Sequence, residues 1–326
     1  MKFFAALFLL FSAALLPAQD IDQVLAAGNN DGLKVEGRVA FTEGPAWHAA
    51  TKNVYFTDIQ NNRILRRDPT GAVHTYRTPS GRANGLLFDG KGRLHACEGG
   101  REGGNRRITR TELDGSVTVL TADFNGRKYN SPNDLVIDSK DRIYFTDPRY
   151  GDRDDMQITD ADGKPVEGVY RIDPDGKVTQ ILTHEIDRPN GIELSADEKF
   201  LFVADNSNGK AGDNRKLWRF DLKADGTVEP GSRKELFDWG TDRGPDGMCL
   251  GPDGNLYVTA GFNFPDLPAQ TLKKFRSGVY VISQEGGLQR FIPIPMDMIT
   301  NCTFGGEDGK TLFVTAGHKL WSLPIQ

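Results

Sequence analysis

The sequence has few cysteines, no excess of basic residues and no long amphipathic helical stretch, and each shortage excludes a class of protein. Only 3 cysteines occur in 326 residues, at widely spaced positions, so no disulfide framework is expected to hold the fold. The 40 Lys and Arg are outnumbered by 45 Asp and Glu, and the net charge of −5 argues against a nucleic-acid partner. The 5 His are scattered and share no zinc-like spacing with the cysteines, which disfavours a soft or borderline metal.

A long apolar run stands out only at the N-terminus. Lys2 precedes an apolar segment at residues 3–16, which is followed by Leu-Pro-Ala at 16–18. This order predicts a signal peptide over residues 1–18 with cleavage near Ala18. The run is shorter than the ~20 apolar residues that span a bilayer, although a short membrane anchor is the alternative. We therefore expect an exported protein, periplasmic or secreted, that has no membrane contact after cleavage.

What the sequence does contain is a repeat. With 37 Gly and 17 Pro, its composition fits a protein of strands and turns. Along the chain, an Asn, Asp or Glu in a turn-like tripeptide recurs just ahead of a short apolar strand, with successive gaps of 41, 49, 57, 56 and 55 residues. A unit of that length is typical of a four-stranded propeller blade. These anchor residues are Glu43, Asn84, Asn133, Asn190, Asp246 and Asn301.

The third repeat shows the four strands most clearly, at residues 135–138, 143–146, 168–172 and 178–182. The last repeat holds only three, and residues 33–40 have the strand character to supply its outer strand. Closure of this kind removes exposed sheet edges. The sequence therefore predicts an all-β, six-bladed β-propeller with four-stranded blades, closed by N- and C-terminal strands in one blade. Residues 19–326 would form this single domain.

The strand order also predicts which face carries function. The short turns at 139–142, 174–176, 252–255 and 307–309 all fall on one face of the disc. The anchor residues fall on the other face, together with the long loops at 149–167, 206–215 and 261–277. Long loops on a rigid scaffold commonly carry function, so we expect the site on the anchor face.

Two interpretations of the anchor residues remain open from their chemistry. Pro-Asn-Gly and Pro-Asp-Gly are common turn sequences, so each one alone is compatible with a plain turn. As a set, however, Glu43, Asn133, Asn190 and Asp246 are oxygen donors at equivalent blade positions, which a propeller brings to its axis. Two carboxylates and two amides suit a hard divalent cation. Ca²⁺ is favoured, with Zn²⁺, Mn²⁺ and Mg²⁺ as alternatives.

Several motifs resemble one family. They are Phe-Thr-Glu-Gly-Pro-Ala-Trp at 41–47, Asn-Ser-Pro-Asn-Asp at 130–134, Phe-Thr-Asp-Pro at 145–148, Arg-Pro-Asn-Gly at 188–191 and Gly-Pro-Asp-Gly-Met at 244–248. In order and content they resemble the gluconolactonase/regucalcin (senescence-marker-protein-like) family. The resemblance implies a six-bladed propeller with a divalent metal, usually Ca²⁺, in its axial tunnel. It places the ligands at Glu43, Asn133, Asn190 and Asp246, and it implies a small-molecule lactone as substrate.

The chain departs from the family at two places that concern the substrate. Ser131 stands where some members have an arginine that grips a sugar lactone, and Cys-Glu-Gly-Gly at 97–100 replaces Cys-Glu-His-Gly. Arg149 and Tyr150 are candidates for a replacement contact, although Arg149 could instead be a solvated loop residue. Substrate contacts are also expected from Asn84, Asn133 and Asn301. For Asn84 and Asn301, turn formation alone is the alternative explanation.

The resulting hypothesis is a metal-dependent lactonase. The metal would polarise the lactone carbonyl while a carboxylate activates water, with Asp246 the first candidate for the base and Glu43 the second. One alternative is a phosphotriesterase or organophosphate hydrolase on the same metal. Another is a non-catalytic, calcium-stabilised binding propeller. The candidate apolar patch for it is the loop with Phe262, Phe264 and Leu267, which we interpret instead as a lid or wall over an apolar part of the pocket. The sequence leaves monomer and dimer both open.

Overall fold

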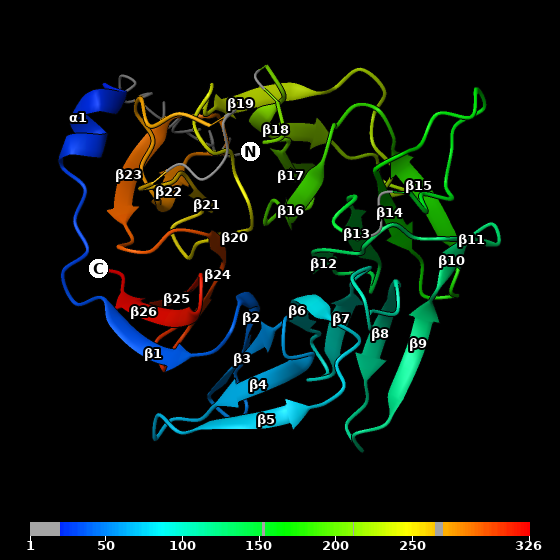
Figure 1. The fold of residues 1–326 in the computed structure, drawn as a ribbon, viewed down its shortest axis with the longest axis horizontal. Helices are drawn as coiled ribbons and strands as arrows, with labels where there is room; N and C mark the ends of the chain where they lie inside the picture. The colour runs from blue at the N-terminus through cyan, green and yellow to red at the C-terminus, as the bar shows by residue number, and fades with distance from the viewer. Residues whose placement is uncertain (1–19, 152–153, 211, 265–269) are drawn as a thin grey trace, which may run out of the picture.

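Six four-stranded antiparallel sheets surround a central axis in the computed structural model, which describes residues 20–151, 154–210, 212–264 and 270–326 (Figure 1). From innermost to outermost strand, blade one consists of β2 (Thr42–His48), β3 (Asn53–Asp58), β4 (Arg63–Arg67) and β5 (Val73–Arg77), and blade two of β6 (Ala83–Phe88), β7 (Leu94–Glu98), β8 (Arg107–Thr111) and β9 (Val117–Thr121). In the same order, blade three consists of β12 (Leu135–Ile137), β13 (Ile143–Asp147), β14 (Gly168–Ile172) and β15 (Val178–Leu182), and blade four of β16 (Pro189–Leu194), β17 (Phe200–Asn206), β18 (Arg215–Asp221) and β19 (Lys234–Asp238). Blade five consists of β20 (Met248–Leu250), β21 (Leu256–Ala260), β22 (Gly278–Ile282) and β23 (Leu288–Pro293), and blade six of β24 (Ile299–Gly305), β25 (Thr311–Ala316), β26 (Lys319–Pro324) and β1 (Lys34–Arg38).

The hydrophobic core lies between the blades. Middle strands such as β13, β14, β21 and β22 are buried at every position, because each is covered on both faces by the neighbouring blades. Outer strands are more exposed, and β5 buries none of its residues fully. Each pair of adjacent blades shares one apolar cluster, so stability is distributed around the ring.

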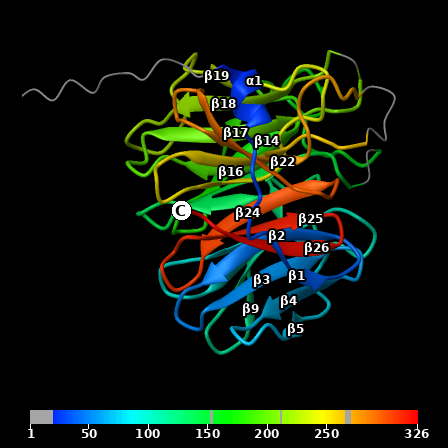
Figure 2. The same ribbon diagram turned by 90° about the vertical axis from the view of Figure 1, so that its left-hand side faces the viewer.

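The ring closes where the strand pattern predicted. Strand β1 pairs antiparallel with β26, with Lys34 opposite Ser322 and Arg38 opposite Lys319, and Figure 2 shows the two strands side by side. The Ser322 hydroxyl donates to Glu36 Oε1 across this pair at 2.6 Å. The prediction of a six-bladed propeller, closed by the two terminal strands in one blade, is confirmed.

Some short elements were not predicted. Helix α1 (Ile21–Ala26) is capped by Asp20 and contacts β23, and the hairpin of β10 (Asp123–Phe124) and β11 (Arg127–Lys128) lies between blades two and three. Such short elements give no periodic signal. The predicted loop at 206–215 is too long by one residue at each end, because Asn206 and Arg215 pair with each other across β17 and β18.

The predicted signal peptide, residues 1–18, lies outside the described residues and stays a prediction. Within the described segments, no helix has both the length and the apolar character needed to cross a membrane.

Candidate active site

Four anchor residues lie on the innermost strands and the other two lie just ahead of them, and none of the six is in a turn. At four of them the strand pairing shifts register, between Glu43 and Ala46 in β2 and at the equivalent places in β6, β16 and β24. Asn133 and Asp246 precede β12 and β20, and each donates its backbone N–H to the second strand, at 2.9 and 2.8 Å. The turn-only interpretation of the anchor residues is therefore wrong. β-Bulges of this kind re-aim side chains, here towards the propeller axis.

Glycines that follow anchor residues let neighbouring blades touch. Gly85 N–H donates to the carbonyl of Asn133 at 2.7 Å, and Gly191 N–H donates to that of Asp246 at 2.9 Å. A Cβ on Gly191 would lie 2.5 Å from that same Asp246 oxygen. The Asn-Gly pairs that suggested turns thus serve close contact between innermost strands.

An aspartate at the end of several second strands holds the segment leading to the anchor residue. Asp147 accepts from the backbone N–H groups of Asn130 and Ser131 at 2.8 and 2.7 Å. Asp205 does the same for Asp187 and Arg188 at 3.1 and 3.0 Å. Burial raises the pKa of Asp147 to about 7. The Phe-Thr-Asp-Pro motif therefore acts by positioning the innermost strand of its blade.

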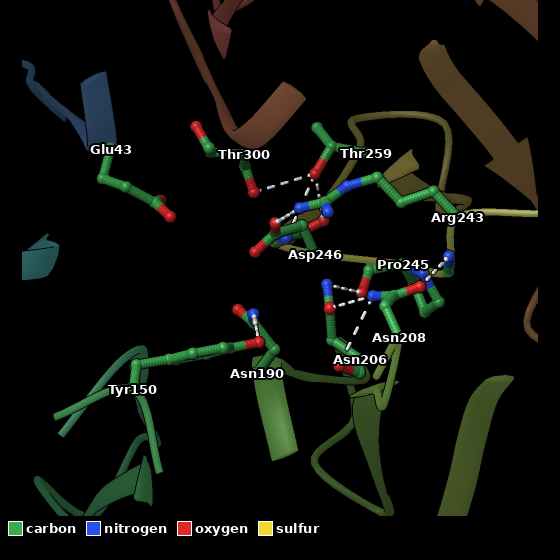
Figure 3. Close-up of polar contacts among 12 residues, drawn as sticks. Glu43, Tyr150, Asn190, Asn206, Asn208, Arg243, Pro245, Asp246, Thr259 and Thr300 are labelled. Atoms are coloured by element: carbon green, nitrogen blue, oxygen red, sulfur yellow. Dashed lines mark hydrogen bonds and ion pairs between the residues drawn. The ribbon is translucent and has the colours of Figure 1, made fainter. Parts of the chain in front are cut away.

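A cavity of about 250 Å³ opens on the anchor face. Five of the six anchor residues line it, together with Tyr150, and Figure 3 shows Glu43, Asn190 and Asp246 directed towards one space. The anchor residues that line it are Glu43, Asn84, Asn133, Asn190 and Asp246.

Two predicted site residues lie elsewhere. Asn301 is buried and donates through Nδ2 to Asp134 Oδ2 at 3.0 Å. Arg149 Nε pairs with Glu167 Oε1 at 3.0 Å. Among the described residues, neither of the two lines the central cavity.

The two cavity carboxylates are buried and have few partners. Among the described residues, Glu43 Oε2 accepts only from Gly44 N–H, at 3.3 Å, whereas Asp246 accepts from Arg243 Nη2 at 3.0 Å and from the side chain of Asn190. Burial raises the pKa of Glu43 well above its usual value, and repulsion from Asp246 and Asp134 raises it further. Burial also raises the pKa of Asp246, to about 6, against the opposing effect of Arg243. These two acids destabilise each other's ionised forms.

The two amides have oxygen atoms free for a ligand. Asn190 Nδ2 donates to the Tyr150 hydroxyl at 3.0 Å, so its Oδ1 atom does not take part in that bond. The side chain of Asn133 makes no hydrogen bond with any residue in the described part of the chain. Carboxylate and amide oxygens are the donors that Ca²⁺ takes, and a divalent cation would offset the repulsion between Glu43 and Asp246. The predicted ligand set therefore fits such a cation.

His, Cys, Asp and Glu side chains alone give no metal-binding group of three among the described residues. The ligand set described above does not form such a group, because two of its four members are amides.

Sequence reasoning missed several residues of the cavity. Asn206 Nδ2 donates to the Pro245 carbonyl at 2.6 Å, and Asn208 Oδ1 accepts from Gly244 N–H at 3.0 Å. These amides hold the segment that carries Asp246 (Figure 3). Four arginines of the cavity were also missed. Two of them, Arg82 and Arg188, could have been found from the repeat, because each lies two residues before an anchor residue, as Ser131 does. The arginines are Arg82, Arg101, Arg188 and Arg243.

The loop that we expected to form an apolar wall does not do so through its aromatic residues. Phe262 is buried, with the guanidinium of Arg243 5.4 Å from its ring centroid, whereas Phe264 is 78% exposed. Neither lines the cavity. The rest of that loop, residues 265–269, lies outside the described residues.

Comparison with known proteins agrees with this architecture. A gluconolactonase from Zymomonas mobilis is 29% identical over 302 residues, which cover 86% of this chain and 78% of that relative. A regucalcin from Xenopus laevis is 26% identical over 293 residues, 87% of each chain. The solved structure of a gluconolactonase from Xanthomonas campestris, 29% identical, matches with a TM-score of 0.73 over 90% of this chain and 89% of that one.

A family model, the SMP-30/Gluconolactonase/LRE-like region, matches residues 41–318, which is most of the chain. The resemblance inferred from the motifs is thereby confirmed, and the chain belongs to the SMP-30/gluconolactonase/LRE-like family.

Proposed function

We propose that this protein hydrolyses a lactone with the help of a divalent cation, with Ca²⁺ the favoured ion. The observation that carries the proposal is the meeting of two buried carboxylates and two amides around one small cavity. Relatives named gluconolactonase support the reaction class. The ion would be held by Glu43, Asn133, Asn190 and Asp246.

Asp246 is the first candidate for the general base. Its Oδ2 atom accepts from Arg243 at 3.0 Å, and a side-chain hydrogen bond from Asn190 also reaches the carboxylate, which lines the cavity where a water molecule could lose a proton to it. Without a cation, burial raises the pKa of Asp246 to about 6, so the group is mostly ionised near neutral pH and can both bind a cation and accept a proton. Glu43 faces the same space and is the second candidate. A bound divalent cation supplies Lewis-acid polarisation of a carbonyl oxygen.

Other residues fix the geometry of these groups. Tyr150 accepts from the amide of Asn190 and so orients it, and Asn206 and Asn208 hold the backbone on either side of Pro245. The cavity, about 250 Å³, has room for one small ring rather than for a polymer. A small monomeric lactone therefore fits the site.

The test is a substrate panel run on the purified protein after chelation, with Ca²⁺, Mg²⁺, Mn²⁺ or Zn²⁺ then added back singly. The panel contains gluconolactone, a pentonolactone, dihydrocoumarin and an aryl phosphotriester, and acid release is followed with a pH indicator or, for the phosphotriester, by phenolate absorbance. We expect cation-dependent ring opening of at least one lactone. Turnover of the phosphotriester alone would favour the organophosphate hydrolase. A cation-dependent rise in melting temperature without any turnover would favour a binding propeller.

A further inference from the structure

The cavity has the opposite charge to the rest of the molecule. The chain has a net charge of −5, yet four arginines line the cavity against only two carboxylates, Glu43 and Asp246. No lysine, histidine or further acid is found among the described lining residues. Because a divalent cation held by Glu43 and Asp246 would offset both carboxylates, the positive charge of the arginines would remain.

Two of the arginines have no acidic partner within the described chain. Arg82 donates to the carbonyls of Glu102, Ile59 and Gln60, at 2.8, 2.9 and 2.5 Å, which fix the guanidinium without neutralising it. Arg101 is exposed, and its guanidinium makes no ion pair or hydrogen bond with a described residue. The charge of both groups is therefore available to a ligand.

The other two arginines are partly neutralised. Arg243 pairs with Asp246 at 3.0 Å. Arg188 lies over the Tyr150 ring at 5.8 Å, and its Nε atom is buried without a hydrogen bond, 3.6 Å from Glu167 Oε2. Glu167 makes its shorter ion pair with Arg149. The positive charge without an acidic partner among the described residues is therefore that of Arg82 and Arg101.

The repeat places these arginines around a small residue. Arg82 and Arg188 lie two residues before the anchor residues of blades two and four, and the equivalent residue of blade three, between them, is Ser131. The Ser131 hydroxyl accepts from Gly100 N–H at 2.8 Å, next to Arg101. The short side chain leaves room beside the guanidinium groups of the neighbouring blades.

We propose that the natural substrate carries an anionic group, a carboxylate or a phosphate, in addition to its lactone ring, and that Arg101 with Arg82 binds this group. This inference rests on the proposed lactone hydrolysis and names its substrate class. A neutral polyhydroxylated lactone needs only hydrogen-bond partners, which the amides supply. Guanidinium groups match carboxylate and phosphate oxygens in pairs, and an anion would balance their charge.

The experiment compares lactones of matched ring size on the cation-loaded protein. Glucono-1,5-lactone is compared with its 6-phosphate, and galactono-1,4-lactone with glucaro-1,4-lactone, which carries a carboxylate. We expect kcat/KM to be at least ~10-fold higher for one anionic member, and this preference to shrink as salt is added. The two pairs distinguish phosphate from carboxylate, and a preference for either supports the proposal.

Arg101→Gln should raise KM for the preferred anionic lactone by ~10-fold and so lower the ratio of its kcat/KM to that of the matched neutral lactone, and Arg101→Lys should retain part of the preference. Arg38→Gln is the matched control, because Arg38 is exposed on β1, far from the cavity. Equal kcat/KM for neutral and anionic lactones, or an unchanged ratio in Arg101→Gln, would overturn the inference but leave lactone hydrolysis standing. Failure to hydrolyse every lactone would overturn both.

Discussion

At the scale of the residue, position in the blade decides the chemistry of an aspartate more than its neighbours in sequence do. Pro-Asp-Gly occurs at 174–176, 245–247 and 252–254. Asp253 lies on a hairpin turn, where it accepts from Asn255 and Tyr257. Asp246 lies at the start of an innermost strand, where burial raises its pKa to about 6. The same three residues thus form a turn in one place and a candidate active site in another.

This contrast provides a matched pair for mutagenesis. Asp246→Asn and Glu43→Gln should each lower kcat for lactone hydrolysis by ~10²-fold or more, since each removes a group that can accept a proton and a negative ligand. Asp253→Asn changes the same tripeptide on the opposite face and should leave kcat unchanged. Steady-state kinetics with saturating Ca²⁺ checks the expectation. Full activity in both cavity variants would contradict the assignment.

At the scale of the element, the innermost strands line the cavity and also contact the neighbouring blades. Threonines on the second strands link neighbouring blades: Thr57, Thr146 and Thr259 donate to carbonyls of Asn84, Asn190 and Thr300, at 3.1, 2.7 and 2.9 Å. The glycine after an anchor residue permits the same close approach. Asn84, Asn133, Asn190 and Asp246 are therefore held by backbone contacts to a neighbouring blade as well as by their own.

Gly191→Ala tests this packing. Its Cβ would meet Asp246 O at 2.5 Å and Gly247 Cα at 2.7 Å, which are backbone atoms and cannot rotate away. We expect a loss of about 2–3 kcal/mol in stability, as in other overpacked sites, together with reduced activity because the Asp246 segment must move. Gly90→Ala is the control, since a Cβ there meets no atom within 4 Å. Chemical denaturation measures both, and equal stability of the two variants would argue against close blade packing.

The sequence predicted the strands better than their irregularities. Apolar runs such as 143–146 and 168–172 gave the middle strands almost to the residue, because burial on both faces leaves a continuous apolar signal. The bulges at Glu43 and Asn190 were taken for possible turns, since a bulge depends on the partner strand and not on local sequence.

In the candidate site, too, some residues could be predicted from the sequence and others could not. Residues fixed by the repeat reached the cavity, as Asn84 and Asn133 did. Arg149 did not, because its direction depends on an ion pair with Glu167, a residue at the far end of its loop. Arg82 and Arg188 could have been found by aligning the repeats, whereas nothing in the sequence near Asn206 indicates that it bonds to Pro245.

At the scale of the whole molecule, the four ligand candidates connect distant parts of the ring. Glu43, Asn133, Asn190 and Asp246 come from blades one, three, four and five, so a cation held by them would stabilise the closed propeller. Binding to the folded state adds RT ln(1 + [L]/Kd), about 2.7 kcal/mol at a hundredfold excess over Kd. For a chain of this size that corresponds to a rise in Tm of about 5 °C.

The rise in Tm that a bound cation produces should be larger at high pH than at low pH. Without a cation, the pKa of Asp246 is raised to about 6 and that of Glu43 is raised well above its usual value, so in a window that opens near pH 4 and extends to at least pH 6 the folded state binds more protons than the unfolded chain. Stability of the chelated protein should therefore fall as the pH rises through this window. A cation binds the ionised carboxylates, so its contribution to the free energy of unfolding should be small at pH 5 and largest at about pH 8. At pH 8 it should offset the loss of stability seen in the chelated protein.

Differential scanning fluorimetry at pH 5 and pH 8, with a chelator or with increasing Ca²⁺, separates cation binding from other effects of salt. At pH 8 the Tm of the wild-type protein should climb with the logarithm of Ca²⁺ concentration, whereas in Asp246→Asn the climb should begin only at higher Ca²⁺ concentration, because one charged ligand is lost. Asp253→Asn should behave like the wild type. An equal rise at both pH values, or a rise that Asp246→Asn leaves intact, would mean that the ion binds elsewhere. The axial ligand set would then be wrong, even if the protein proved to be a lactonase.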